Sequence, residues 1–510
     1  MSWAVDYSLM PLKGVTFGGI IATAIVVAIL VREVTVEFIQ YAVLTAVYLL
    51  KFHPLAKYPG PRLAAVTRLV HSYHLLSGTV VRFAHQAHEK YGPVVRIAPD
   101  EVLFTSSKAW EAIYGLQPGR LEMSKDTPLF RGPRTPHAIV TAEHDLHRLY
   151  RRLLSKGFSE AALREQEPVI QGKIDLLLAQ LHEEASKGVA PEMTSWFNFF
   201  TFDLIGELAF GESFGCLESS TYQPWVAMIF EVMKYRGFMQ ALNYYPSVSS
   251  ALLRLLPKSY AETFATHKQL THEKVQRRIE KKVTYNDLTA NLLNPDHKLE
   301  RYQIDGNCST LIIAGSETTS TALSATTYYL TQYPEAKAKV IQEVRSTFQK
   351  PGEITSISVN QLKYLPACFT EAMRRFPPGP AVFPRRVPRE GAWVAGHWIP
   401  EGMQVGICHF AANNSRLNFQ DPKRFVPERW LGDPAYAKDD RHAMQVFSVG
   451  PRNCLGQSLV KLELHLVLCR FIWEFDWELS PESENWDHDT PVFNTWGVKP
   501  LRIFLTPVSR

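Results

Sequence analysis

Two apolar runs near the N-terminus stand apart from the rest of the hydrophobic pattern. Residues 14–31 carry no charge over eighteen positions, which as a helix would cover roughly 27 Å of hydrocarbon. A second apolar run, residues 38–50, follows almost at once but is short for a full crossing. The pattern predicts an N-terminal membrane anchor over residues 1–57, with the second run as another span or as an interfacial helix.

The remainder of the chain, residues 58–510, is dominated by helical periodicity. Strand-like patterns are confined to residues 91–104, 392–399 and 501–505. A proline-rich turn at residues 58–61 separates this part from the anchor, and no Gly/Ser-rich or charged linker divides it further. We expect one large domain, mainly α with a small β portion.

Composition and charge exclude several classes of function. Hydrophobic residues make up 46% and aromatic residues 12% of the 510 residues, which is enough for an enclosed apolar cavity. The net charge of +5 is spread along the chain, so no nucleic acid is expected as a partner. The six cysteines include no C-x-x-C pair, which argues against zinc and disulfide frameworks and indicates a reducing compartment.

Three positive charges follow the apolar runs, at Lys51, Lys57 and Arg62. Because positively charged segments beside a membrane span stay on the cytoplasmic side, they favour a cytoplasmic catalytic domain.

One cysteine stands in a loop directly before an apolar helix. The loop contains Phe447, Gly450, Arg452, Cys454 and Gly456. A thiol binds metal as thiolate, and a helix N-terminus and a nearby cation stabilise that form. The glycines let the backbone turn sharply and bring N–H groups toward the sulfur, while Arg452 can reach a haem propionate. A lone cysteine here is most often a small buried hydrophobe, but four further positions agree with Cys454 as the axial ligand of haem iron.

A second candidate site interrupts the apolar helical stretch 304–330. Its residues are Ala314, Gly315, Glu317 and Thr318. A mid-helix glycine costs about 1 kcal/mol relative to alanine, and Gly315 beside Ala314 would let a flat ligand approach the backbone. Thr318 can bond back to the Ala314 carbonyl, and Glu317 can relay protons. Taken alone, such residues usually serve packing or the surface; with Cys454 in the same chain we predict Thr318 and Glu317 as catalytic.

These two motifs resemble those of a known family. The pattern Phe-x-x-Gly-x-Arg-x-Cys-x-Gly is similar to the haem-binding signature of the cytochrome P-450 superfamily, and residues 314–319 resemble its Ala-Gly-x-Asp/Glu-Thr motif. The resemblance spans roughly residues 58–510. It implies the cytochrome P-450 fold, haem b as cofactor, and oxygen activation by Thr318 and Glu317.

The resemblance also implies a scaffold. Glu371 and Arg374 match the family's Glu-x-x-Arg motif, and Arg429 lies in the segment that supplies a third, arginine partner. By itself, a pair of opposite charges three residues apart is common on the surface of a helix and indicates no function. Within the family pattern the three residues would form a buried ion network that fixes the cysteine loop, with a role in folding and haem retention.

Further residues are implied as haem propionate contacts. His147 and Arg151 stand four apart where the family has Trp-x-x-x-Arg, so this chain has histidine in place of tryptophan. Arg385 and Arg386 follow a proline-rich stretch and offer another contact, and either one could turn inward.

The implied function is that of a haem-thiolate monooxygenase, which inserts one oxygen atom from dioxygen into an apolar small molecule. Residues 196–203, 210–215 and 427–430 are most similar to fungal secondary-metabolism members of the trichothecene-hydroxylase type, which implies a terpenoid, polyketide or alkaloid intermediate. No dinucleotide fingerprint follows a strand, so electrons from NADPH should arrive through a separate cytochrome P-450 reductase docking near Cys454. The expected location is the endoplasmic reticulum membrane, with the catalytic domain facing the cytosol.

Two other functions remain possible on the sequence: a haem-thiolate isomerase or dehydratase acting without external electrons, and a non-catalytic haem protein. The intact 314–319 segment argues against the isomerase, which needs no proton relay.

Candidate pocket residues, each of which could equally be core, are Phe130, residues 230–245, residues 304–314, residues 381–383 and Trp496.

Overall fold

The computed structural model describes residues 17–510 apart from 118, 120–121, 126–128, 131–137, 248, 250–257, 282–286, 494 and 510. The side chains of residues 17–23, 30, 233–236, 258 and 260 also lie outside the description. Contacts divide the chain into two compact units, Met1–Lys57 and Tyr58–Arg510.

The first unit contains one long helix, α1 (Phe17–Lys51), of 35 residues. The second apolar run and most of the first therefore belong to a single helix, with Arg32, Glu33 and Glu37 between them. Among the described residues, the helices lack an apolar stretch of the length that a membrane crossing needs. Residues 14–16 of the first run, and the side chains of residues 17–23 and 30, lie outside the description, and the predicted anchor is not confirmed.

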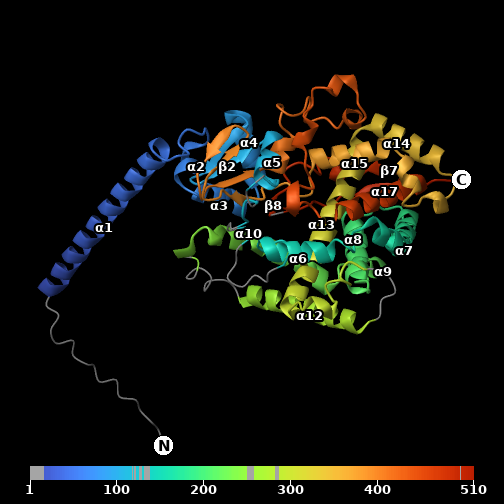
Figure 1. The fold of residues 1–510 in the computed structure, drawn as a ribbon, viewed down its shortest axis with the longest axis horizontal. Coiled ribbons are helices and arrows are strands. Elements are labelled where there is room, and N and C mark those ends of the chain that lie inside the picture. The colour runs from blue at the N-terminus through green and yellow to red at the C-terminus, as the bar shows by residue number, and fades with distance from the viewer. Residues whose placement is uncertain are drawn as a thin grey trace, which may run out of the picture. The chain divides into compact units, whose positions relative to one another are not determined.

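The second unit contains a small sheet in the order β1-β2-β6-β3. Strands β1 (Val94–Ala98) and β2 (Glu101–Phe104) form the predicted hairpin, with Val95 opposite Leu103. Strand β6 (Gln404–Ile407) pairs parallel with β2, and β3 (Arg385–Arg386) pairs antiparallel with β6. The helices beside this sheet are α2 (Arg62–Val66), α3 (Leu69–Leu76), α4 (Val80–Tyr91) and α5 (Lys108–Tyr114) (Figure 1).

Three antiparallel strand pairs complete the β portion. They are β4 (Ala392–Val394) with β5 (His397–Ile399), β7 (Phe475–Leu479) with β10 (Ile503–Pro507), and β8 (Val492–Phe493) with β9 (Thr495–Trp496). The strands predicted at residues 392–399 and 501–505 are confirmed.

Helices make up most of the second unit, as predicted. The longer ones are α6 (His144–Leu154), α7 (Glu160–Ser186), α8 (Met193–Phe210), α10 (Pro224–Asn243), α12 (Lys258–Glu280), α13 (Arg301–Gln332), α14 (Pro334–Thr347), α15 (Tyr364–Arg375) and α17 (Gln457–Glu474). Shorter elements are α9 (Cys216–Ser219), α16 (His409–Asn413) and the 3-10 turns η1 (Pro295–His297), η2 (Pro351–Glu353), η3 (Ser358–Gln361), η4 (Pro427–Trp430), η5 (Pro434–Tyr436), η6 (Arg441–Ala443), η7 (Gly450–Arg452) and η8 (Pro481–Ser483).

Helix α13 occupies the centre of this unit and packs against α8, α12, α15 and α17 (Figure 1). It begins with a capping box between Glu300 and Gln303, and it ends at Tyr333 because Pro334 cannot continue the helix. The helix predicted over residues 304–330 is thus confirmed. Because both α13 and α17 reach this centre, side chains from distant parts of the sequence can meet there.

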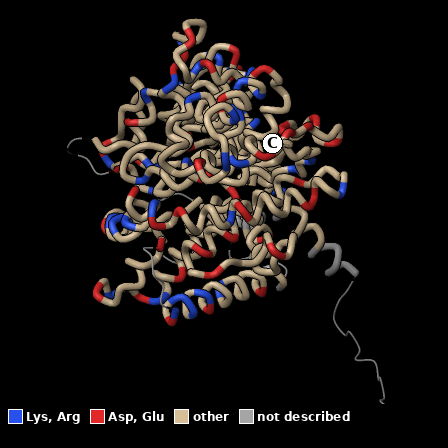
Figure 2. The backbone as a smooth tube through the Cα atoms, turned by 90° about the vertical axis from the view of Figure 1, so that its right-hand side faces the viewer, with Lys and Arg blue, Asp and Glu red and all other residues tan. Residues whose placement is uncertain are grey.

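Charged residues of both signs are distributed over the described backbone. Figure 2 shows Lys and Arg interspersed with Asp and Glu in this view, rather than gathered on one side. The distribution agrees with the spread-out charge of the sequence.

Candidate active site

Cys454 lies in a tight loop that leads into α17. Gly450 has φ +74°, and a Cβ on it would lie 2.1 Å from the Tyr114 carbonyl oxygen, so both conformation and space require glycine there. The Cys454 N–H donates to the Phe447 carbonyl at 2.7 Å, which closes the loop. Cys454 is exposed, whereas the other five cysteines are buried. The thiol is therefore accessible to a large ligand.

Two groups favour the thiolate form of Cys454. The surrounding protein atoms partly desolvate the Cys454 thiol and raise its pKa overall, although the residue is exposed at the surface; the Gly456 backbone N–H and the Arg151 guanidinium act in the opposite direction. Gly456 has an ordinary φ of −82°, so its contribution is this N–H rather than a strained turn. Arg151, from α6, also donates to the carbonyl and side-chain oxygens of Asn453. The cation beside the sulfur is thus Arg151 and not its sequence neighbour Arg452.

A group of cations lies beside this loop. Arg452 donates to Glu122 (Nε···Oε1 2.7 Å) and, through a terminal nitrogen, to the Ala142 carbonyl at 2.8 Å. Burial, and then the charges of Arg385 and Arg452, lower the pKa of Lys125 well below its usual range. Burial opposes ionisation of Glu122, but Arg452 and its other partners hold the Glu122 pKa below its usual range. The Glu122 carboxylate in turn partly offsets the lowering of the Lys125 pKa. Among the described residues, Arg385, Arg452 and Lys125 lie close to one carboxylate, Glu122, and this set of side chains fits the two propionates of haem.

The structure distinguishes Arg385 from Arg386. Arg385 is 4% exposed, lies 4.9 Å from the centre of the Tyr114 ring and belongs to the cation group. Burial lowers its pKa to about 10. Arg386 instead donates to the Gly402 carbonyl at 2.7 Å. Arg385 is the inward-facing residue of the pair.

His147 is buried on α6, close enough to the cation group to feel its charge. Burial, and then Arg452, lower the pKa of His147 to about 4, so the ring is neutral near pH 7. The histidine that replaces the family's tryptophan therefore adds no further positive charge.

Ala314 and Thr318, one helical turn apart on α13, are referred to together as the notch. The Thr318 hydroxyl donates to the Ala314 carbonyl at 2.7 Å, which confirms the predicted back-bond. Ala314 is exposed although much of the surrounding helix is packed. Gly315 faces another way: a Cβ on it would lie 3.0 Å from Cδ1 of Ile205 on α8. Gly315 thus lets α8 and α13 pack closely, and its predicted contact with a flat ligand stays a prediction.

Glu317 lies next to the notch and contacts a C-terminal strand. Its Oε1 accepts a hydrogen bond from the Thr495 hydroxyl on β9 at 2.8 Å. Burial raises the pKa of Glu317 to about 7, and the Thr495 hydrogen bond acts weakly in the other direction. A carboxyl group with this pKa can take up and release a proton near neutral pH.

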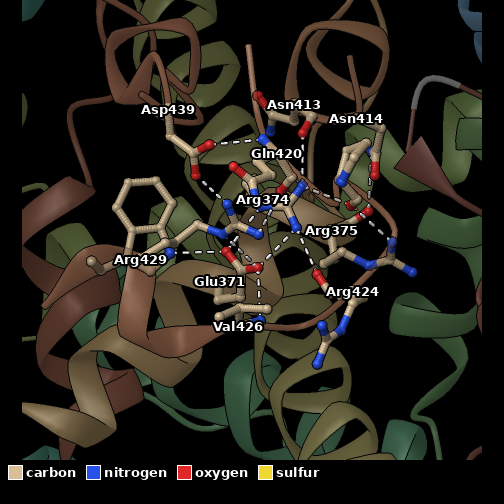
Figure 3. A network of polar contacts seen from close by, with 12 residues as sticks. Glu371, Arg374, Arg375, Asn413, Asn414, Gln420, Arg424, Val426, Arg429 and Asp439 are labelled. Carbon is tan, nitrogen blue, oxygen red and sulfur yellow. Dashed lines mark hydrogen bonds and ion pairs between the residues drawn. The ribbon is translucent and has the colours of Figure 1, made fainter. Parts of the chain in front are cut away.

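The predicted ion network is present and fully buried (Figure 3). Arg374 donates to both oxygens of Glu371, at 2.9 and 2.8 Å, and Arg429 Nε donates to Oε1 at 3.1 Å. Asp439 pairs with Arg429, and Trp430 donates to Glu371 Oε2 at 2.9 Å. Arg374 and Arg429 also donate to main-chain carbonyls of residues 413, 420, 422 and 424. The network therefore fixes the chain that precedes the cysteine loop rather than the loop itself.

An open pocket lies between the sheet, α3, α4 and the end of α10. Its apolar lining residues are Leu75, Val80, Val81, Ala84, Ile97, Leu103, Leu129, Ala381, Val382, Pro384 and Cys408, and its polar ones are His71, Glu101, Gln240 and Tyr244. Residues 381–382 and part of the predicted 230–245 stretch thus line this pocket. Trp496 does not: it stacks on Phe376 at 4.1 Å and donates to the Pro377 carbonyl. Phe130 lies under the Lys125 ammonium, 4.6 Å from it.

The predicted residues fall into three groups. One comprises Cys454, Arg151, Arg452, Arg385 and His147; the second is Ala314, Glu317 and Thr318; the third is the Glu371 network. In the described part of the chain, no hydrogen bond or ion pair joins the first two groups directly, but their helices α13 and α17 pack together. Sequence reasoning missed Glu122 and Lys125, because neither belongs to a motif and each meets its partners only in the folded chain.

Comparison with known proteins agrees with this site. A mainly helical fold with an exposed cysteine ahead of a helix, close to several cationic side chains, is the arrangement expected of a haem-thiolate protein. Residues 59–506 match the cytochrome P-450 family. The chain therefore belongs to that family, and it is a monooxygenase like its curated relatives.

The similar proteins include several fungal enzymes. The cytochrome P-450 monooxygenase cpaH of Aspergillus oryzae is 63% identical over 472 residues, covering 92% of this chain and 93% of that protein. The cytochrome P-450 monooxygenase lcsI of Purpureocillium lilacinum is 40% identical, with coverage of 92% and 93%. Trichothecene C-15 hydroxylase of Fusarium sporotrichioides is 38% identical, with coverage of 92% and 96%. The predicted resemblance to fungal members of the trichothecene-hydroxylase type is confirmed.

Proposed function

We propose that this monooxygenase inserts one oxygen atom from dioxygen into an apolar secondary-metabolite intermediate of the terpenoid, polyketide or alkaloid class. The observation that carries the proposal is the exposed Cys454 in the loop just before α17, with the Arg151 guanidinium acting on its thiol and Arg452 two positions away. The similarity to fungal monooxygenases, among them a trichothecene hydroxylase, supports the substrate class.

The haem would be held from two sides. Cys454 would bind the iron, and Arg452, Arg385 and Lys125 would pair with the propionates. The negative charge of the propionates would add to that of Glu122 beside these cations. Haem with a thiolate ligand supplies the oxidation of unactivated carbon centres by dioxygen. The protein contributes position, exclusion of water and the movement of protons.

Protons would reach the reaction through α13. The Thr318 hydroxyl, which donates to the Ala314 carbonyl, keeps its oxygen available as an acceptor toward the open side of the notch. Glu317 exchanges protons near neutral pH and is held in place by Thr495. Thr318 orients and Glu317 supplies protons, so removing either would release reduced oxygen as peroxide instead of product.

Substrate would occupy the pocket between α3, α4 and α10 and the space beside Ala314. The apolar lining of the pocket suits a hydrophobic molecule, and its few polar groups would fix orientation. Ala381 and Val382 come from the strand-side segment just before Arg385, so pocket and propionate contacts share one stretch of chain.

Electrons would come from a separate NADPH-dependent cytochrome P-450 reductase. Arg148, Arg152 and Lys156 are exposed on α6 and just after it, the same segment that presents Arg151 to the cysteine loop. An acidic surface on the reductase would complement these three cations.

The first unit would attach the enzyme to the endoplasmic reticulum membrane, with the second unit facing the cytosol. Exposed apolar side chains along α1 support this, among them Val27, Val34, Phe38 and Leu44, as do the cations Lys51 and Lys57 that follow. Removal of residues 1–57 should move the protein from the microsomal pellet to the supernatant.

The experiment that tests the function uses microsomes containing this chain and a reductase. A panel of terpenoid, polyketide and alkaloid precursors is incubated with NADPH, and products are examined by mass spectrometry for the gain of one oxygen atom. The reduced, carbon monoxide-treated sample should show a strongly red-shifted Soret band. Cys454→Ser should abolish both signals, whereas Cys469→Ser, at a buried cysteine within α17, should retain them. Product formed without NADPH would instead indicate an isomerase.

A further inference from the structure

A buried hydrogen-bonded chain connects three helices outside the catalytic residues. Trp225 on α10 donates through its indole N–H to His267 Nδ1 on α12 at 2.9 Å. His267 Nε2 lies 3.0 Å from the Ser309 hydroxyl on α13. Trp225 and His267 are 6% and 5% exposed, so water does not compete for these bonds.

The direction of the chain follows from its chemistry. An indole N–H can only donate, so His267 Nδ1 must accept and the ring must carry its proton on Nε2. Nε2 therefore donates to the Ser309 oxygen. Burial lowers the pKa of His267 to about 4, which keeps the ring neutral and this tautomer in place near pH 7. Each of the three side chains has one defined role.

The Trp225–His267–Ser309 hydrogen bonds act on α10, the helix that also carries pocket residues. Trp225 is the second residue of α10, whereas Gln240 near the end of that helix and Tyr244 just beyond it line the pocket. About nineteen residues at 1.5 Å per residue separate Trp225 from Tyr244, a distance of roughly 28 Å. At the pocket end Tyr244 contacts the His71 ring of α3, with ring centres 5.4 Å apart, so a tilt of α10 at Trp225 would change this contact and with it the shape of the pocket. Ser309 fixes the other end of the chain on α13, the helix that carries Thr318.

We propose that the Trp225–His267–Ser309 chain is the pivot that sets the position of α10 over the substrate pocket, with His267 as a positioning residue for substrate binding. The proposal rests on the proposed function, because it takes this pocket as the substrate site. The pivot does not touch the reacting atoms, so it governs how tightly a ligand is enclosed and leaves proton delivery at Thr318 unaffected.

A matched pair of substitutions tests the pivot. His267→Gln keeps one acceptor and one donor on a planar amide, while His267→Leu removes both. The probe is 4-phenylimidazole bound to the holoprotein and followed by its absorption change, with carbon monoxide as a small ligand that needs no enclosure. We expect 4-phenylimidazole to dissociate about tenfold faster from the Leu variant and within about twofold of wild type from the Gln variant, with carbon monoxide binding unchanged in both.

Hydrogen exchange provides a readout that does not depend on haem. Amides of α10 should lose protection in His267→Leu and regain it in His267→Gln, while amides of α17 stay protected. Trp225→Phe removes the indole N–H together with part of the ring, and it should lose at least as much protection in α10 as the Leu variant; Trp196→Phe on α8, which makes the same change in side-chain size, is the control. Equal behaviour of the Leu and Gln variants in both measurements would overturn the pivot. Loss of the azole spectrum in wild type would count against the proposed function, while exchange in α10 would still report on the pivot.

Discussion

Arg151 and Asn453 join helix α6 to the cysteine loop. The guanidinium of Arg151 donates to both the carbonyl and the side-chain oxygen of Asn453, the residue directly before Cys454. A bidentate contact of this kind fixes orientation as well as distance. The loop is therefore bound to α6 through Arg151. Gly450, earlier in the same loop, packs against the Tyr114 carbonyl at the end of α5.

Loss of this contact should loosen the haem. Arg151→Gln cannot span both oxygens, so the loop should fray and haem should transfer to a scavenging apoprotein roughly tenfold faster than from wild type. Arg152→Gln, an exposed arginine one position along the same helix, is the control and should transfer haem at the wild-type rate. Equal rates in the two variants would show that the Asn453 contact does not retain haem.

The buried ion network should behave differently from the cysteine loop. Glu371→Ala leaves Arg374 and Arg429 without their shared carboxylate in a fully buried site, at a cost of roughly 3–5 kcal/mol. We expect a large fall in melting temperature and a low haem content in the purified protein. Glu335→Ala, on the exposed side of α14, should change neither. Normal haem content in Glu371→Ala would contradict the scaffold role.

Short-range chemistry was predictable from the sequence. The Thr318 back-bond needs only a hydroxyl four residues after a carbonyl, and the pairing of Glu371 with Arg374 needs only i, i+3 spacing on a helix. The loop around Cys454 could be predicted for the same reason, since its glycines and its helix are neighbours in sequence.

Contacts between distant segments could not be predicted in this way. Glu122 meets Arg452 across 330 positions of sequence, and Arg151 meets Asn453 across 302. The packing of Gly315 against Ile205 is another such contact, because nothing in the sequence near Gly315 indicates that α8 lies beside it. Which face of α13 is open is decided by the packing of α8, not by residue type.

Electron transfer should depend on the exposed cations of the α6 segment. Reversing the charge with Arg152→Glu and Lys156→Glu should raise the reductase concentration needed for half-maximal turnover about tenfold at low salt, with a smaller effect at high salt. Turnover driven by added peroxide needs no reductase and should stay unchanged. A parallel loss of peroxide-driven turnover would mean that the substitutions damage the site itself.

Glu317 should link product yield to pH. The carboxyl is protonated below its pKa of about 7, so the yield of product per NADPH should fall as pH rises through that value. Glu317→Gln should lower the yield by roughly a hundredfold, with peroxide formed instead, and should remove the pH dependence. Thr495→Val deletes the hydrogen bond that favours the carboxylate, so the inflection should move to higher pH. The ratio of product to peroxide, measured from pH 6 to about pH 9, checks all three outcomes.

Glu463 should make the stability of the fold depend on pH. This carboxyl on α17 is 4% exposed and lies near Thr319 of α13, and burial raises its pKa to about 8. The unfolded chain releases the same proton near pH 4.5, so between these values folding takes up a proton and the free energy of unfolding falls as pH rises. Glu463→Gln removes the ionisable group while keeping its shape.

Relative to wild type, the Gln variant should therefore gain stability between about pH 5 and pH 8, by an amount of the order of a few kcal/mol. Chemical denaturation of both proteins at several pH values measures the difference directly, and contributions from other titrating groups, Glu317 included, cancel in the comparison. A difference that stays constant over this range would mean that Glu463 is ionised in the folded protein. In that case a compensating cation would have to approach α17 at Thr319, and the packing of α13 on α17 would rest on charge rather than on a neutral acid.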